Sequence, residues 1–207
     1  MKASAVIGYV RRAGLRKSIA ASRGAIVSIR FHIFVRYRGA KAFTGCPQGV
    51  EIFPDATDLL RALRSGRQDL PTEFYRDEMI RGGRCSVATV EGRLAGVAWA
   101  YEHPIERPHL ILGPGEVELS ASYTLPEFRG RGLYRTLMRF AVDWMHGEHE
   151  RIFTMASHDN LTPLKTFVEI GFEEVAVLRR PSIFGPRFDT RSMRIQTWGQ
   201  AFSDAVR

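Results

Sequence analysis

The stretch Pro126-Glu127-Phe128-Arg129-Gly130-Arg131-Gly132-Leu133-Tyr134 joins a strand-like run that ends at Leu125 to a strongly periodic helix. Its two glycines leave backbone N–H groups open to close approach by a ligand. The helix that begins near Arg131 directs the positive end of its dipole and its unpaired N–H groups at the same place. Such an arrangement suits a phosphate or pyrophosphate group, and the two arginines add favourable charge. The stretch therefore predicts a site for a nucleotide-like cofactor.

The charge is distributed unevenly along the chain. The first 50 of the 207 residues hold ten Lys or Arg and no Asp or Glu, whereas the remaining 157 hold 20 basic and 22 acidic residues. This asymmetry predicts a basic N-terminal arm, residues 1–41, that contacts an anionic membrane surface or another polyanion. Specific nucleic-acid recognition is not expected, because no stacking platform is interleaved with the charge.

Two cysteines, Cys46 and Cys85, lie far apart and have no metal-ligand spacing. They favour a reduced, cytoplasmic setting with no metal site. No apolar run approaches the ~18 residues that a bilayer-spanning helix needs, so membrane contact is expected only at the periphery. Organellar targeting by the arm and a homodimer both stay open.

Hydrophobic periodicity predicts the order of the elements. Residues 6–20 have loosely helical spacing, and residues 29–38 alternate with period two, which predicts a half-buried strand with a basic outer face at a sheet edge. Further strands are expected at 50–53, 84–90, 94–101, 116–125, 152–156, 172–178 and 191–196, and helices at 57–63, 71–81, 131–147 and 161–170. The pattern predicts an α/β fold with a mixed sheet covered by helices, in which residues 1–48 are a basic extension (a helix and the edge strand) and residues 49–207 are the main domain.

The glycine stretch matches a known cofactor motif: Arg or Gln, two residues, Gly, one residue, then Gly or Ala. Arg129 and Gly132 fill it, with Tyr134 in place of the last small residue. Asn160 is followed eleven residues later by Gly171-Phe172, the spacing of a fourth helix and sixth strand in the same family. On these motifs, residues 50–196 resemble the GNAT-type N-acetyltransferases.

The resemblance implies a mostly antiparallel sheet that splays around acetyl-CoA or a longer acyl-CoA. The pyrophosphate would bind the N–H groups of residues 129–134, and the pantetheine would pair with the preceding strand. Asn160 would hydrogen-bond the cofactor or cap its helix. The expected cofactor-binding residues are Tyr123, Thr124, Leu125, Arg129, Gly130, Arg131, Gly132, Leu133, Tyr134 and Asn160.

Acyl transfer to an amine needs a base for the amine and a proton for the departing thiolate. By alternation, Glu116, Glu118, Ser120, Ser122 and Thr124 share one face of their strand, although a bulge there would change the face beyond it. A glutamate eleven residues before Arg129 resembles the general base of histone-type members. Glu118 is therefore the first choice and Glu116 the second, the alternative being that both are solvated strand residues.

The proton donor is less well defined by the sequence. Phe167 stands seven residues after Asn160, where many members carry a tyrosine, so Tyr123, Tyr134 or water would have to replace it.

The family's acceptor pocket would involve the first two helices and loops such as residues 102–112. The leading hypothesis is transfer of an acetyl or other acyl group from acyl-CoA to a primary amine of a small molecule or peptide. The alternative is a non-catalytic acyl-CoA-binding or membrane-surface regulatory module of the same fold.

Overall fold

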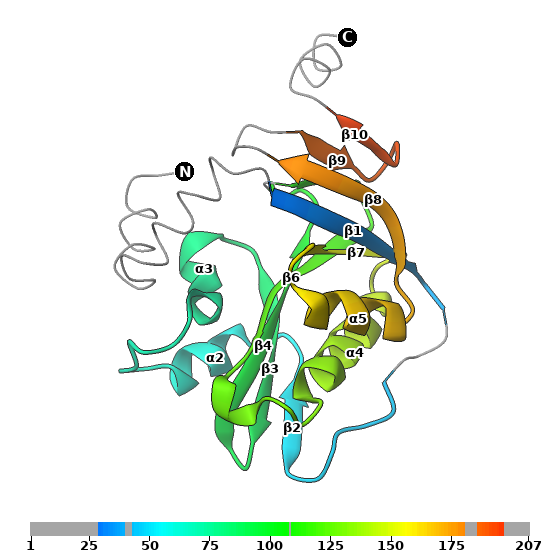
Figure 1. Cartoon of the computed structure of the whole chain (residues 1–207). Coiled ribbons are helices and arrows are strands. Elements are labelled where there is room, and N and C mark those ends of the chain that lie inside the picture. Colours follow the sequence, from blue (N-terminus) through cyan, green and yellow to red (C-terminus); the bar gives the residue numbers. More distant parts are fainter. Residues whose placement is uncertain (1–28, 40–42, 108, 181–185, 197–207) are drawn as a thin grey trace.

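A seven-stranded sheet, in the order β2-β3-β4-β6-β7-β1-β8, runs through the molecule (Figure 1). The computed structural model describes residues 29–39, 43–107, 109–180 and 186–196, so the helix expected over residues 6–20 and most of the basic arm lie outside the described residues. Across the sheet the strands are β2 (Val50–Phe53), β3 (Arg84–Val90), β4 (Arg93–Glu102), β6 (Glu116–Thr124), β7 (Arg151–Ser157), β1 (Ile29–Tyr37) and β8 (Glu173–Arg180).

Neighbouring strands of this sheet are antiparallel except for β6 and β7. The expected mixed, mostly antiparallel sheet is therefore confirmed. A smaller sheet was not expected from the sequence, because two of its strands are only two and three residues long: it contains β10 (Arg194–Gln196), β9 (Arg187–Asp189) and β5 (Leu110–Ile111).

Helices cover both faces of the large sheet. The longest helix, α4 (Leu133–His146), packs its apolar side on β4 and β6 and precedes α5 (Leu161–Glu169). The 3₁₀ turn η1 (Thr72–Tyr75) lies on the other face of β4. Trp99 of β4 contacts it by donating its indole N–H to the carbonyl of Glu73 at 2.7 Å. The remaining helical segments are α2 (Thr57–Leu63), α3 (Arg76–Met79) and the short turn η2 (Pro126–Phe128).

Strand β1 lies within the sheet, paired with β7 on one side and β8 on the other. The expected edge position is therefore wrong, because period-two alternation reveals a buried face but not the number of neighbouring strands. The prediction that this strand has a basic outer face is also only partly correct. Phe34 on that face is buried against Phe167 of α5, with ring centroids 5.4 Å apart. On the opposite face, Ile33 and Val35 pack in a core shared with Phe188 of the small sheet.

Candidate functional site

Strands β6 and β7 form a fork. Their parallel pairing runs only from Glu116 opposite Arg151 to Leu119 opposite Thr154. At the last pair, the Thr154 hydroxyl donates to the carbonyl of Leu119 at 2.8 Å. Strand β6 continues to Thr124 with its other edge on β4. Beyond Leu119, the edge of β6 that faces β7 is therefore not paired with that strand and can pair with an extended ligand.

A bulge lies in β6 just after the fork opens. Its extra residue, Ala121, has a positive φ of 49°. As a result Ser122 points toward α4, where its hydroxyl contacts the sulfur of Met138 at 3.2 Å. Tyr123 instead faces η1, and its ring meets that of Phe74 at 6.0 Å. The expectation that Ser122 and Thr124 share a face with Glu118 is therefore wrong, because the bulge shifts the alternation by one residue.

Gly130 and Gly132 form the turn that leads from β6 into α4. Both have left-handed backbones, with φ of 75° and 73°. A Cβ at Gly130 would meet nothing within 4 Å, so glycine is needed there for backbone conformation rather than for space. Gly132 is the N-cap residue of α4, no side chain caps this end, and the first turn contains no acidic residue. Its unpaired N–H groups therefore suit an anion such as pyrophosphate.

The arginines of the motif differ in their contacts. Arg129 donates its Nε hydrogen to the carbonyl of Thr124 at 3.0 Å and lies over the ring of Tyr123, 5.1 Å from its centroid. This side chain fastens the turn to the strand, whereas Arg131 is exposed and can reach a ligand. Three predicted residues have buried side chains: Thr124, Leu125 and Leu133. The two leucines can offer a ligand only their backbone.

Tyr134 and Asn160 lie at the starts of the two helices. Burial raises the pKa of the Tyr134 phenol, so this side chain keeps its proton at neutral pH and is a weaker acid than a tyrosine in water. Asn160 is the N-cap residue of α5, but its side chain makes no capping hydrogen bond. Because Asn160 is exposed, its amide is accessible to a ligand.

Glu118 is buried in an ion pair that the sequence did not reveal. Arg107 donates from Nε to one carboxylate oxygen of Glu118 at 2.6 Å and from Nη2 to the other at 3.3 Å. The same Nη2 also donates to the hydroxyl of Ser120 at 2.9 Å. Arg107 comes from the loop after β4, and no spacing rule links a loop residue to a strand partner. The only signal was the expectation that residues 102–112 lie near the acceptor pocket.

Tyr101 of β4 completes this buried group. The guanidinium of Arg107 lies 3.8 Å from its ring centroid. Burial raises the pKa of Tyr101 to about 12, against the opposing effect of the nearby arginine charges. Glu116, the second candidate base, instead bonds the backbone N–H of Gly113 at 2.6 Å and contacts Arg151 and Thr190. Glu116 therefore fastens the small sheet to β6.

The family model of the acetyltransferase (GNAT) family matches residues 53–172, which is more than half of the chain. The chain belongs to the GNAT acetyltransferase family. The GNAT match spans the fork, the glycine turn and the start of both following helices, and members of this family are acyltransferases.

Solved structures support the GNAT fold. A protein assigned to the family from Novosphingobium aromaticivorans superposes with a TM-score of 0.52 and 20% identity, covering 73% of this chain and 62% of its own. A tandem GNAT protein from the clavulanic acid biosynthesis pathway gives a TM-score of 0.51 and 18% identity, covering 77% and 55%. The chain thus spans about three fifths of the length of these structures. No curated protein matches the sequence.

One GNAT feature is replaced in this chain. Phe167 is buried in the core, with its ring centroid 5.4 Å from that of Phe34 and 5.8 Å from that of Phe172. It is a packing residue of α5. This residue has no proton to donate, so Tyr123, Tyr134 and water stay the predicted alternatives for the proton donor.

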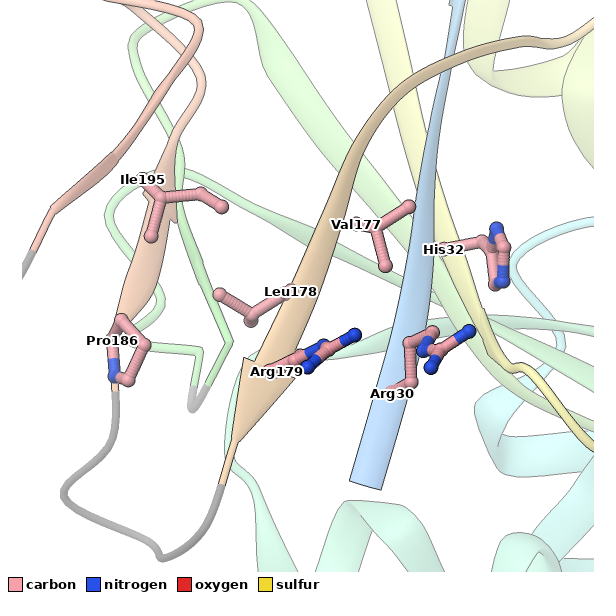
Figure 2. A pocket seen from close by; sticks show the side chains of 7 residues that line it. All are labelled: Arg30, His32, Val177, Leu178, Arg179, Pro186 and Ile195. Carbon is pink, nitrogen blue, oxygen red and sulfur yellow. The ribbon is translucent and has the colours of Figure 1, made fainter. Parts of the chain in front are cut away.

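A separate hollow of about 450 Å³ lies at the β8 edge of the large sheet (Figure 2). In the strand order, β7 and β1 separate β6 from β8, and none of the predicted site residues lines this hollow. Its lining is formed by Arg30, His32, Val177, Leu178, Arg179, Pro186 and Ile195. The hollow is therefore distinct from the fork.

Within the described part of the chain, no helix combines the length and apolarity needed to cross a membrane.

Proposed function

We propose that the protein transfers an acetyl or other acyl group from acyl-CoA to a primary amine by direct attack. The observation that carries this proposal is the fork, where the β7-facing edge of β6 beyond Leu119 has no strand partner among the described residues and leads into the left-handed turn at Gly130 and Gly132. The strand edge suits the amide-containing pantetheine arm, which can add as an extra strand. The turn suits the pyrophosphate.

In this proposal each polar residue of the site has one task. Acyl-CoA supplies the acyl group as a thioester. The N–H groups of residues 130–134 and the Arg131 guanidinium bind phosphate, and Asn160 hydrogen-bonds the cofactor from the β7 side. Glu118 accepts the proton that the amine releases as the new C–N bond forms. Tyr134 donates its proton to the sulfur as the C–S bond breaks.

Calorimetric titration with acetyl-CoA tests the cofactor assignment. We expect saturable binding of acetyl-CoA and no binding of NAD. A Gly132→Glu variant should lose this binding, because its carboxylate would lie where the phosphates bind and its backbone would be strained. Release of free CoA thiol in the presence of a panel of amines then measures transfer. Failure of acyl-CoA to bind the wild-type protein would disprove the proposal.

A second candidate is a non-catalytic acyl-CoA-binding module. The specific observation in its favour is that both oxygens of Glu118 are engaged by Arg107, while the position of the usual tyrosine is the buried Phe167. Acyl transfer to any amine that disappears in a Glu118→Gln variant would exclude this candidate. Binding of acyl-CoA without transfer to any tested amine would favour it.

We also propose that the basic N-terminal residues contact an anionic membrane surface or another polyanion, with the protein in the cytoplasm. Deleting residues 1–40 is an unsuitable test, because β1 is an internal strand. Neutral substitutions of the cations before β1 avoid this problem, and these cations are Lys2, Arg11, Arg12, Arg16, Lys17 and Arg23. We expect the substituted protein to bind acetyl-CoA normally and to lose affinity for phosphatidylserine vesicles. Unchanged vesicle binding would contradict the proposal.

A further inference from the structure

Three polar atoms on the η1 face of the sheet are buried and, within the described part of the chain, have no hydrogen-bond partner. They are Nη1 of Arg107, the hydroxyl of Tyr101 and Nε of Arg76. The Arg107 guanidinium lies over the Tyr101 ring, and the charge of Arg76 also acts on the Tyr101 phenol. Burying such groups unpaired is unfavourable. One ligand that accepts several hydrogen bonds would satisfy all three.

The charges around these atoms favour an anionic ligand. Glu118 uses both oxygens on Nε and Nη2 of Arg107, so this carboxylate leaves Nη1 of the same guanidinium without a partner among the described residues. Asp77, next to Arg76 in the chain, is held by Arg64 at 2.7 Å and 2.9 Å. Within residues 29–39, 43–107, 109–180 and 186–196 no carboxylate pairs with Arg76, so its positive charge is unmatched there. A carboxylate fits a guanidinium in both charge and planar shape, whereas a polyamine would be repelled.

The three atoms lie beside the proposed place of acyl transfer. Ser120, which accepts a hydrogen bond from Arg107, directly precedes the bulge at Ala121 and follows the last residue of β6 that pairs with β7. Glu118 lies on the same face, directly opposite Tyr101 in the β4–β6 ladder. Helix α4 covers the other face. An acceptor held by these atoms would therefore approach the fork from the η1 face, next to Glu118.

We propose that Arg107, Tyr101 and Arg76 form a subsite for a carboxylate of the acyl acceptor, which is therefore an amine that carries a carboxylate group, such as an amino acid. The inference rests on the proposed transfer to a primary amine. Arg76 is half-buried, and the carboxylate enters from its side. Once bound, the carboxylate holds the acceptor on the side of the sheet where Glu118 can take its proton.

The test compares acceptors that differ only in the carboxylate. Initial rates of CoA thiol release are measured with the standard L-amino acids and with their C-terminal amides. We expect the preferred amino acid to have a KM about tenfold or more below that of its amide, because an amide leaves the guanidinium charge unmatched. Direct calorimetric titration of the protein–CoA complex with the same pairs measures binding without turnover.

Two variants assign the preference to this subsite and leave the ion pair between Arg107 and Glu118 in place. Tyr101→Phe removes a hydroxyl that has no hydrogen-bond partner among the described residues, so the fold should be retained. Arg76→Gln removes one charge. Each should raise KM for the amino acid about tenfold, leave KM for its amide unchanged and leave acetyl-CoA affinity unchanged. The matched control is Arg81→Gln, which removes an exposed arginine from the same segment.

The outcomes separate the two proposals. If acyl-CoA does not bind, the proposed function fails. If acyl-CoA binds but amides or polyamines are acylated as well as amino acids, only the carboxylate subsite is overturned. If no transfer is seen, the calorimetric comparison of amino acids with their amides decides whether the carboxylate subsite exists. Equal affinity for the two, or no effect of Tyr101→Phe and Arg76→Gln, would mean that the unpaired atoms bind only buried water.

Discussion

Glu118 has two roles in this structure that a single substitution would confuse. It is the predicted base, and it also neutralises Arg107 in a buried ion pair. Removing one member of such a pair leaves an uncompensated charge and typically costs about 3–5 kcal/mol of stability. A loss of activity in Glu118→Gln would therefore have two explanations unless stability is measured as well.

A double variant separates these roles. Glu118→Gln alone should lower both the free energy of unfolding and the rate of acyl transfer. Combining it with Arg107→Gln removes both charges, so most of the lost stability should return while the rate stays at least about a hundredfold low. Urea unfolding and CoA thiol release measure the two effects. Recovery of the rate together with stability would show that Glu118 acts only as the partner of Arg107.

The glycine turn offers a matched pair of substitutions. Gly132→Ala places a side chain at a φ of 73°, which costs about 1–2 kcal/mol, and it should weaken acetyl-CoA binding at least about tenfold by displacing the N–H groups. Gly115→Ala imposes the same strain at a φ of 75° in a different turn. It should lower stability equally and leave the Kd for acetyl-CoA unchanged in calorimetry. Equal losses of affinity would indicate a general effect of strain.

At the scale of elements, the bulge determines what β6 presents to each side of the sheet. A β-branched residue tolerates a positive φ poorly, so Ala121→Val should cost about 1–2 kcal/mol of stability and weaken acetyl-CoA binding. Ala121→Gly tolerates the same backbone and is the control, with affinity retained. Both are measured by urea unfolding and calorimetry. An Ala121→Val protein with wild-type affinity would show that the bulge does not shape the cofactor site.

The carboxylate of Asp77 links α3 to α2. Burial acts to raise the pKa of Asp77, but hydrogen bonds from Arg64 and Arg61 outweigh it and hold the pKa below its usual range. The stabilisation is therefore complete above the unfolded pKa of about 3.9 and is lost as pH falls toward the lower native pKa. Urea unfolding between pH 6 and pH 2 should show a stability difference between wild type and Asp77→Asn that shrinks below about pH 4. A stability difference that stays constant from pH 6 to pH 2 would contradict this account.

The sequence predicted local features well and their three-dimensional partners poorly. Element positions were predictable because the periodicity of residues 84–101 and 131–147 is a local property. The turn at Glu91 and Gly92 was predictable for the same reason, and both residues have positive φ. The Glu118–Arg107 pair could not be inferred, because it depends on how a loop folds back over a strand. The sequence indicated only what a bulge would change, not that one is present, because an alanine at position 121 does not predict a left-handed backbone.

At the scale of the whole molecule, β1 joins the large sheet to the small one. Val35 is fully buried between them, whereas Tyr37 on the same face is half exposed. Val35→Ala should lower the free energy of unfolding by about 1–3 kcal/mol, and Tyr37→Ala should have a much smaller effect. A small effect at Val35 in denaturant unfolding would support the predicted boundary between residues 48 and 49. A large effect would place β1 in the main domain.

The position of β1 also affects the order of events during synthesis. His32 and its partner His158 are 126 residues apart in the chain. The ribosome therefore synthesises β1 early. Both hydrogen-bonding edges of this strand remain unpaired until β7 and β8 have been synthesised. Contacts of such long range slow folding and leave strand edges open to other chains. Aggregation during expression should therefore respond to translation speed more than to the stability of the finished fold.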